Sequence, residues 1–517
     1  MKRPCDEAAI RAVRAGDCAA QDKVWVLVGT ILASSIAFID ESVVNIALPA
    51  MEKDLGASVA VIQWIVSAYT LCLAALLLIG GATGDRYGRR RAFVAGMTIF
   101  AATSLWCGLA GDIAQLLAAR AVQGVGAALM IPCSLAIIGA TFTESERGKA
   151  IGTWAGVTSL AAAVGPLLGG WIVDHTSWRA IFLINPVLAV PTIWIALRHI
   201  PESRDLQATG ALDWRGAVLS FAGLGLLVFG LIALPSWGWR NLPVIASIAA
   251  GVALLIAFVI VEKRALHPMM PPALFRSPTF SGVNLLTLLL YTALGGAFFF
   301  LPFALMQVHG YSATIAGASF LPFTIVMGGL SRWSGGLIDR VGARLPLVVG
   351  PAICALAYVL FAFADADSSY AVSFVLPIVV LSLGMVVTVA PLTTAVINAV
   401  PPTQTGVASG INNSVSAVAG LLAVAIFGAL ALGIHDHALD RRSAAVTPGV
   451  SHAIEAARGQ FVIEPALAGL QGEERAQAAT ILRSSLADGI SAAMVLAAAL
   501  SLAAGLCAAL TIPARVK

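Results

Sequence analysis

Long apolar runs alternate with short polar segments along most of the chain. Because one crossing of a bilayer needs about 20 predominantly apolar residues, we count fourteen predicted spans. They lie at residues 24–51, 59–81, 92–110, 113–138, 150–173, 178–197, 214–234, 243–261, 279–303, 315–338, 345–364, 371–396, 406–433 and 486–511. The pattern predicts an all-α integral membrane protein with 14 transmembrane helices, whose two ends lie on the same side of the membrane.

Composition and charge agree with this interpretation and orient the chain. Of 517 residues, 59% are hydrophobic and only 11% are charged, which is far from the average soluble domain. Most of the 31 Lys and Arg fall in loops on the side of the N-terminus. The positive-inside rule therefore places both termini in the cytoplasm and the chain in the cell membrane. The net charge of +4 reports this orientation and does not indicate a nucleic-acid partner.

The segment between the second and third spans reads Gly-Ala-Thr-Gly-Asp-Arg-Tyr-Gly-Arg-Arg-Arg over residues 81–91. The same spacing of Gly, Asp and Arg recurs 254 positions later. The pairs are Gly81 and Gly335, Asp85 and Asp339, Arg86 and Arg340, Gly88 and Gly342, and Arg90 and Arg344. Any short inside loop collects Gly and Arg, but five matches at fixed spacing indicate an internal duplication.

The duplication divides the chain into four parts. Residues 1–23 are basic without an apolar core, and they predict a cytoplasmic tail instead of a signal peptide. Two six-helix repeats follow, spans 1–6 in residues 24–197 and spans 9–14 in residues 278–517. Between them, residues 198–277 hold an inserted central helix pair with its cytoplasmic linkers.

Each residue type in the duplicated loop has a structural reason. Gly81 and Gly84 lack side chains, so a neighbouring helix can approach closely. Asp85 is expected to cap the next helix and meet its positive dipole end, and Gly88 supplies the turn. The arginines are costly in lipid and favour the cytoplasmic face; they are Arg86, Arg89, Arg90 and Arg91. We expect this loop, together with Asp339 and Arg340 of the second copy, to act as a conformational switch.

The loop resembles the signature G-x-x-x-D-R-x-G-R-R of the major facilitator superfamily, with a complete match in the first copy. The second copy has Ala343 where the first has Arg89. Fourteen spans with an inserted pair resemble the drug:proton antiporter branch, in which parallel halves rock about a midplane site. The resemblance implies multidrug efflux: a monomeric, proton-coupled exporter of amphipathic small molecules that works by alternating access without a cofactor.

The first span contains two acidic residues, Asp40 and Glu41, well inside its apolar run. A carboxylate in a membrane span is costly, so its presence points to a function. In the antiporter branch this helix typically reads L-D-x-T-x-V-N-V-A-L-P, and Asp40 and Asn45 match it. Asp40 is therefore the first candidate for the titrating group, although a carboxylate that only braces a broken helix remains possible. Glu41, about 100° further round the helix, could face water near the outer rim.

Arg120 lies seven residues into the fourth span, roughly 10 Å deep. Asp40 lies at a comparable depth, so the two can pair, either as a proton-coupling site or as a static salt bridge. Arg120 opens a run that continues through Gln123, and superfamily members show R-x-x-Q-G-x-G-A here.

The fifth span has one face stripped of side chains and a proline that bends it. The residues are Gly156, Gly165, Pro166, Gly169 and Gly170. Their pattern resembles the motif associated with antiporters in place of symporters, and it predicts close packing against the opposite half. Generic small-residue packing between helices explains the same pattern.

Candidates for lining a substrate path are polar and uncharged. They are Asn45, Gln123, Asn284, Asn412 and Asn413. An amide contact between helices is an equal alternative for the asparagines of the second half.

Residues 434–485 form one long polar loop, which we expect to be a solvated outside cap. His435 and His437 could bind a metal, but two histidines without further ligands at fixed spacing favour surface positions, and no metal is predicted. The chain has no G-x-x-x-x-G-K-[ST] loop, so ATP is not the expected energy source. A membrane-embedded enzyme or sensor is an alternative of another class, but an enzyme would need a cluster of reactive groups at one depth, and the polar set inside the spans is too sparse. The other open functions are export of one endogenous metabolite, and import by a symporter or facilitator.

Overall fold

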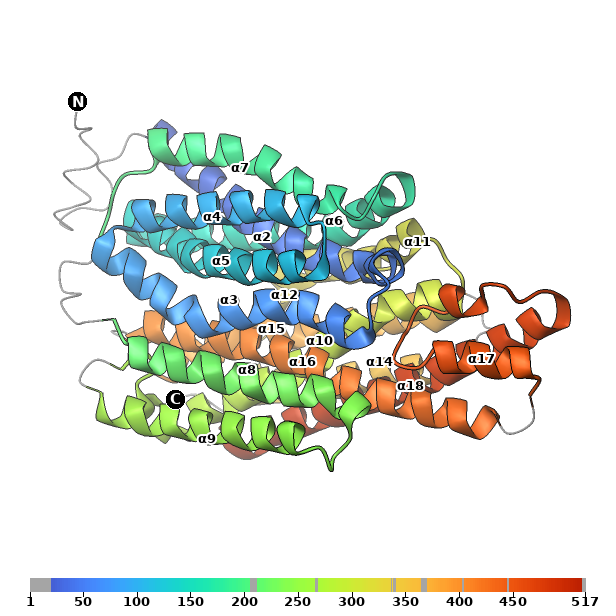
Figure 1. Cartoon of the computed structure of the whole chain (residues 1–517). Coiled ribbons are helices and arrows are strands. Elements are labelled where there is room, and N and C mark those ends of the chain that lie inside the picture. Colours follow the sequence, from blue (N-terminus) through green and yellow to red (C-terminus); the bar gives the residue numbers. More distant parts are fainter. Residues whose placement is uncertain are drawn as a thin grey trace.

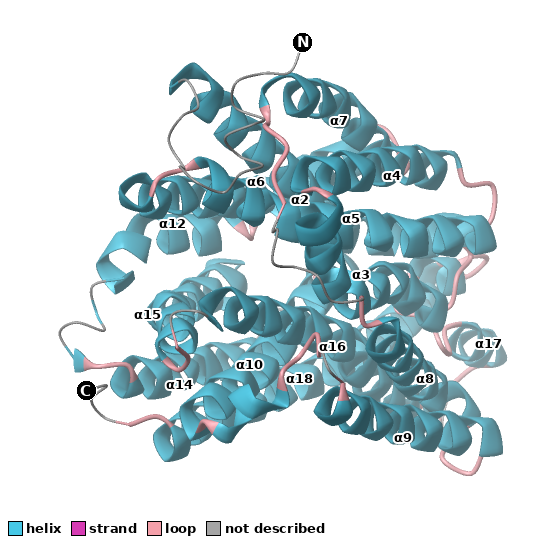
Figure 2. Cartoon of the chain, turned by 90° about the vertical axis from the view of Figure 1, so that its left-hand side faces the viewer, coloured by secondary structure: helices cyan, strands magenta, loops and turns pink. Residues whose placement is uncertain are grey.

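The computed structural model describes residues 20–204, 212–265, 268–335, 337, 341–363, 370–401, 404–443 and 446–513. In these ranges the regular structure is helical throughout and contains no strand (Figure 2). Fourteen of the described helices are long and apolar enough to cross a membrane. The predicted fold class and the number of spans are therefore confirmed.

The long helices run side by side in one bundle (Figure 1). The first half contains α2 (Ala20–Leu55), α3 (Val59–Tyr87), α4 (Arg89–Leu109), α5 (Ile113–Thr141), α6 (Glu144–His175) and α7 (Ala180–His199). The inserted pair consists of α8 (Trp214–Trp237) and α9 (Leu242–Arg264). The second half contains η1 (Pro272–Arg276), α10 (Pro278–Phe303), η2 (Ala304–Val308), α11 (Ala313–Ala318), α12 (Leu321–Gly335), α14 (Arg344–Ala362), η3 (Ala371–Val375), α15 (Leu376–Asn398), α16 (Thr405–Arg442), α17 (Pro448–Ala456), η5 (Glu464–Leu467) and α18 (Gly472–Thr511).

The two ends of the bundle differ in character. One end carries the turn from α3 to α4 with its arginines, the start of α2 and the end of α18, and we refer to it as the basic end (Figure 1). The opposite end carries α17 and is referred to as the cap end. The chain is thus a multi-pass membrane protein with an even number of candidate spans.

The helices of each half pack mainly within that half. In the first half, α5 contacts both α3 and α4, and α2 contacts α5, α6 and α7. In the second half, α14 contacts α15 and α18, and α10 contacts α16 and α18. The inserted helix α8 contacts α3 of the first half and α16 of the second, which also touch each other. The inserted pair therefore lies along the seam between the halves.

The turn between α3 and α4 depends on Gly88. Its φ of +117° is in a region that side chains rarely adopt, and a Cβ there would lie 2.7 Å from Glu202 Oε1. Glu202 Oε1 accepts a hydrogen bond from the backbone N–H of Arg90 at 3.1 Å. Glu202, from the segment after α7, therefore occupies the start of α4.

The prediction that Asp85 caps α4 was wrong. Asp85 remains in the last turn of α3, and the chain turns only at Gly88. Its carboxylate instead pairs with Arg89 in the first turn of α4, with an Oδ1 to Nη2 distance of 2.7 Å. Asp339 and Arg340 of the second copy lie outside the described residues.

Close helix approach at the glycines of α3 matches expectation. A Cβ at Gly84 would lie 2.5 Å from the sulfur of Cys133 on α5, and one at Gly81 would lie 3.5 Å from Pro132. Gly84 therefore has no room for a side chain while α5 holds this position.

The expectation of a solvated loop at 434–485 was wrong. Helix α16 continues to Arg442, α18 begins at Gly472, and α17 lies between them. Helices of 38 and 40 residues are roughly 57 and 60 Å long at 1.5 Å per residue, about twice the thickness of the hydrocarbon layer. Residues 434–443 and 446–485 therefore form a folded, largely helical cap beyond the membrane.

The cap has an apolar interior that is continuous with the core of the bundle. Its buried side chains include Val450, Ile454, Phe461, Leu467 and Leu482. The Phe461 ring packs edge-on against Phe300 and Phe303 of α10 and against His435. His435 is only 2% exposed, so its expected surface position was also wrong, whereas His437 is exposed.

Candidate functional site

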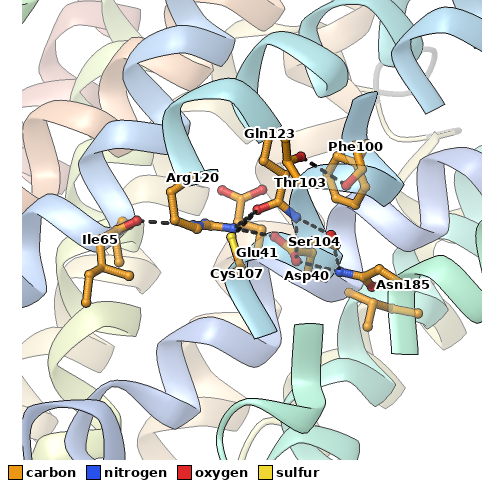
Figure 3. Close-up of polar contacts among 12 residues, drawn as sticks. Asp40, Glu41, Ile65, Phe100, Thr103, Ser104, Cys107, Arg120, Gln123 and Asn185 are labelled. Carbon is orange, nitrogen blue, oxygen red and sulfur yellow. Dashed lines mark hydrogen bonds and ion pairs between the residues drawn. The ribbon is translucent and has the colours of Figure 1, made fainter. Parts of the chain in front are cut away.

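The polar centre of the first half is the carboxylate of Asp40 on α2, which is only 2% exposed (Figure 3). Arg120 Nη1 on α5 donates to Asp40 Oδ2 at 2.7 Å. Gln123 Nε2 donates to Oδ1 at 3.0 Å, and Asn185 Nδ2 of α7 donates to the same oxygen at 2.7 Å. Three donors from two helices thus surround one buried carboxylate, and the expected contact between Asp40 and Arg120 is present.

The guanidinium of Arg120 is held on several sides. Its Nη1 also donates to Gln123 Oε1 at 2.7 Å, and its Nε donates to the Ile65 carbonyl of α3 at 3.2 Å. The face of the group lies 4.4 Å from the centre of the Tyr69 ring, a distance typical of a cation–π contact. A buried arginine with these partners is positioned more tightly than a lysine would be, because its planar fork uses several donors at once.

Two members of the network were not predicted as site residues. Asn185 on α7 and Ser104 on α4 are both fully buried, and Ser104 Oγ accepts from Gln123 Nε2 at 2.6 Å and from Asn185 Nδ2 at 3.1 Å. An amide inside the apolar run of the sixth span was a signal for Asn185. A single serine in a helix carries no comparable signal.

Gln123 was expected to line a substrate path, but it has no exposed surface. It belongs to the Asp40 network instead. Asn45 is half-buried, and its amide donates to the backbone carbonyl of Glu41 one helical turn earlier, at 3.2 Å.

Glu41 is exposed although its neighbour Asp40 is buried. It lies 14 residues before the end of α2 at Leu55, roughly 21 Å along the axis, and therefore deeper than the outer rim where we expected it. Helix α2 is flanked by α5, α6, α7 and α10, so an exposed side chain at this depth faces the space between the two halves.

Helix α6 uses its glycines in two different contacts. A Cβ at Gly165 would lie 2.1 Å from Ser42 Oγ, and one at Gly169 would lie 2.7 Å from Val43 Cγ1, both on α2. A Cβ at Gly170 would lie 2.1 Å from the Ala313 carbonyl of α11. Close packing against the opposite half is therefore present at Gly170, while Gly165 and Gly169 serve the first half itself.

Helix α6 contacts α11 and α12 of the opposite half, and its closest approach is near the cap end. Gly152 lies five turns before Gly170 and therefore on the same face of α6. Both Gly152 and Gly156 are exposed, and a Cβ at either would meet nothing within 4 Å. The halves thus touch along this face near the cap and are apart toward the basic end.

Among the described residues, three sets of polar contacts join the halves at the cap end, besides the bond from Gln63 Nε2 to the Val424 carbonyl at 3.1 Å. Asp174 at the end of α6 accepts hydrogen bonds from the backbone N–H groups of Ala313 at 3.1 Å and Thr314 at 2.8 Å, at the start of α11. The buried Glu52 Oε1 accepts from the backbone N–H groups of Phe461 and Val462 at 2.7 and 2.9 Å. The third contact runs from the Val59 N–H to the Gly459 carbonyl at 2.9 Å.

The predicted first span ends at residue 51, which leaves Glu52 outside it. Helix α2 continues to Leu55, which brings this carboxylate into the helix, and it is 2% exposed. Asp40 and Glu41 are therefore not the only acidic residues within the helix.

The second half has a neutral counterpart to the Asp40 network. Asn412 Nδ2 on α16 donates to Asn284 Oδ1 at 3.2 Å and to Thr287 Oγ1 at 2.8 Å, both on α10. This is the interhelical amide contact left open as an alternative. Asn413 is exposed. Within the described ranges, no three His, Cys, Asp or Glu side chains lie close enough to hold a metal ion.

Comparisons with known proteins agree with this architecture. The model of the Major Facilitator Superfamily matches residues 30–220 and 207–424. The chain is 35% identical over 479 residues to the tetracenomycin C resistance and export protein of Streptomyces glaucescens, covering 92% of this chain and 88% of that protein. It is 33% identical to the puromycin resistance protein of Streptomyces alboniger, covering 93% of this chain and 97% of that protein.

Among solved structures, a bacterial homologue of the human lysosomal transporter Spinster in an inward-facing, unoccupied conformation has the same fold. The TM-score is 0.66 at 19% identity, with 96% of this chain and 99% of that chain covered. Taken with the family match over most of its length, these similarities show that the chain belongs to the Major Facilitator Superfamily.

Proposed function

We propose that the chain exports amphipathic small molecules across the cell membrane in exchange for protons. The observation that carries this proposal is the ion pair between Asp40 and Arg120, with side chains each 1% exposed. An ionisable pair at this depth is costly, and it is typical of proton relays and ion pathways in transporters. The two relatives named above are resistance proteins, one of them also described as an export protein, and they support the direction of transport.

Alternating access follows from the distribution of contacts between the halves. With the basic end assigned to the cytoplasm, the present arrangement is more open toward the cytoplasm along α6, where Gly152 and Gly156 are exposed while Gly170 contacts α11. Cargo would then bind between the halves on this side. Export requires the contacts of Asp174 and Glu52 at the cap end to break while the cytoplasmic ends close.

Proton coupling follows from the charges. A proton on Asp40 would neutralise the carboxylate and weaken its bond to Arg120, so the network would rearrange. Glu41 faces the space between the halves beside this network and is suited to pass protons or to attract a cationic cargo. Since Arg120 and Asp40 neutralise each other, the site favours a neutral or singly charged cargo over a dication.

The exposed and buried glycines of α6 favour a rocking motion. Gly165 and Gly169 fix α6 to α2 within the first half, whereas Gly170 contacts α11 across the seam. The first half would therefore move as one body against the second. The turn holding Asp85 and Arg89 would stabilise one of the two states from the basic end.

Uptake into inverted membrane vesicles tests the proposal. Tetracenomycin C and puromycin are the probes, each measured with and without an imposed pH gradient, acidic inside. The proposal predicts that both accumulate only with the gradient, and that vesicles without the protein do not respond. Uptake that proceeds equally with no gradient would indicate a facilitator, and expulsion from the vesicles would indicate an importer.

A further inference from the structure

Two carboxyl groups, Asp213 and Glu262, lie close together where the inserted helices begin and end, on elements that take no part in the Asp40 network. Asp213 precedes α8, and its Oδ1 accepts from the backbone N–H of Gly216 at 2.8 Å, which caps the helix. Glu262, in the last turn of α9, is 1% exposed. Its Oε2 accepts from the backbone N–H of Met270 at 2.9 Å, in the segment that leads to α10.

Each of these carboxyl groups has one buried oxygen without a donor. The atoms are Asp213 Oδ2 and Glu262 Oε1. Both lie against Gly216, where a Cβ would be 2.8 Å from the first and 2.5 Å from the second. The two oxygens are therefore at most about 5 Å apart. Two ionised carboxylates can only accept hydrogen bonds, so this contact is repulsive unless one proton lies between them.

The charged groups around the pair do not remove this conflict. Arg215, Lys263, Arg264 and Arg276 of α8, α9 and η1 are exposed, and in the described part of the chain no ion pair joins them to Asp213 or Glu262. Helix α3, which packs on α8, ends at Asp85, Arg86 and Tyr87, and Asp85 pairs with Arg89. The charged residues of α16, which also packs on α8, lie at its cap end.

We propose that Asp213 and Glu262 form a proton-binding site that shares one proton and fastens the inserted helix pair to the segment before α10. A proton fits better than a metal ion, because only two carboxylates meet here and a cation such as Mg²⁺ or Ca²⁺ takes six or more oxygen ligands. Loss of the proton leaves two adjacent negative charges, which push α8 and α9 apart at this end and release Met270. The site therefore ties the connection between the halves to the pH on the basic side.

Infrared spectroscopy and thermal unfolding of the full chain in lipid nanodiscs test this assignment. A protonated carboxyl group absorbs apart from a carboxylate, so alkaline-minus-acidic difference spectra of the wild type should include loss of a carboxyl band that belongs to this pair. Asp213→Asn and Glu262→Gln should each abolish that band. Both amides can donate permanently to the remaining carboxylate, so they also keep the contact without a proton.

The unfolding temperature gives the second readout. A proton held more tightly in the folded chain stabilises it at low pH, and this stabilisation is lost as pH rises. The wild type should therefore lose a few degrees of Tm as pH rises from mildly acidic to alkaline buffer, and Glu262→Gln should flatten that decline. Lys263→Gln, an amide substitution at the next residue, which is exposed, should keep the wild-type profile.

Two results would overturn the proposal. One is a carboxyl band and a Tm profile that remain unchanged in both Asp213→Asn and Glu262→Gln. The other is full restoration of the alkaline Tm by added Na⁺, Mg²⁺ or Ca²⁺ in the wild type but not in Glu262→Gln, which would assign a cation to the pair. Neither readout requires transport, so the outcome is independent of the proposed export activity.

Discussion

In the first half of the bundle, a carboxylate and a guanidinium are buried together between α2 and α5. In the second half, α10 occupies the place in the repeat that α2 has in the first, and its buried polar contact is made by the amides of Asn284 and Asn412. One half therefore contains a group that can change charge, whereas the other is joined by neutral hydrogen bonds. At these equivalent helices of the described chain, the candidate proton chemistry therefore lies in the first half.

The largest effect is expected from Asp40→Asn. The amide retains the shape of the side chain but cannot take up a proton, so pH-driven uphill transport should fall to background while the protein stays folded and inserted. Transport assays in proteoliposomes check this. The matched control is Asn412→Ala in the second half, which removes hydrogen bonds worth roughly 0.6 kcal/mol each on average and should leave coupling intact. Normal coupling in Asp40→Asn would move the role to Glu41.

Arg120→Ala should have the next largest effect. It leaves a buried carboxylate without its partner, which costs about 3–5 kcal/mol in other proteins, so Tm should fall and the pH optimum of exchange should move upward. Arg120→Lys should recover part of the activity, because it restores the charge without the planar fork. Exchange against pH in both single variants and the double variant with Asp40→Asn gives a thermodynamic cycle. Simple additivity would mean that the two residues act independently.

A moderate effect is expected at the cap end, where the two halves meet. Asp174→Ala removes the acceptor for the first N–H groups of α11, and loss of such a cap costs about 0.5–2 kcal/mol. One or two kcal/mol changes a two-state ratio by a factor of about 5–30, so the population open at the cap end should rise. Distances between spin labels on the two halves at that end measure it. Glu473→Ala, at an exposed acid in the first turn of α18, is the control. Equal distance distributions in both variants would contradict the idea that Asp174 holds the two halves together at the cap end.

The smallest effect on Tm is expected at an exposed ion pair of the first half, between Lys23 and Glu146. The hydrogen bonds from Lys23 and Thr143 lower the pKa of Glu146 from 4.5 to about 2. A lowered pKa stabilises the fold above the ordinary value, and the contribution is lost as pH falls from 4.5 toward 2. Because Glu146 is exposed, water screens the pair. Glu146→Gln should therefore change Tm at neutral pH by little more than the error, and a loss as large as that of Arg120→Ala would contradict this.

Much of the architecture could be predicted because bilayer thickness limits helix length. The apolar runs gave the fourteen spans, and the repeated loop gave the two halves with an inserted pair. The prediction of a solvated loop at residues 434–485 failed, because mean hydropathy does not reveal helices in a polar segment. In α18, Ala478, Leu482 and Ser485 recur at helical spacing and are buried, a periodic pattern that the polar composition of residues 434–485 concealed.

The candidate site was predictable in part for a similar reason. Depth along each span sufficed to bring Asp40 and Arg120 together, because a charge inside a span must find a partner. Ser104 and Asn185 could not be assigned in the same way, since their contribution depends on the rotation of α4 and α7 about their axes. Glu202, and not Asp85, lies at the start of α4. This contact joins segments that are distant in the sequence, so no local signal could predict it.

The central claim is that proton movement through Asp40 drives export, and simultaneous measurement of both fluxes tests it most directly. Proteoliposomes would report puromycin movement and the internal pH in the same sample, for the wild type and for Asp40→Asn. The account predicts that each puromycin gradient drives protons in the opposite direction in the wild type, and that Asp40→Asn abolishes the proton flux. Puromycin movement without any change of pH in the wild type, or an equal proton flux in Asp40→Asn, would contradict it.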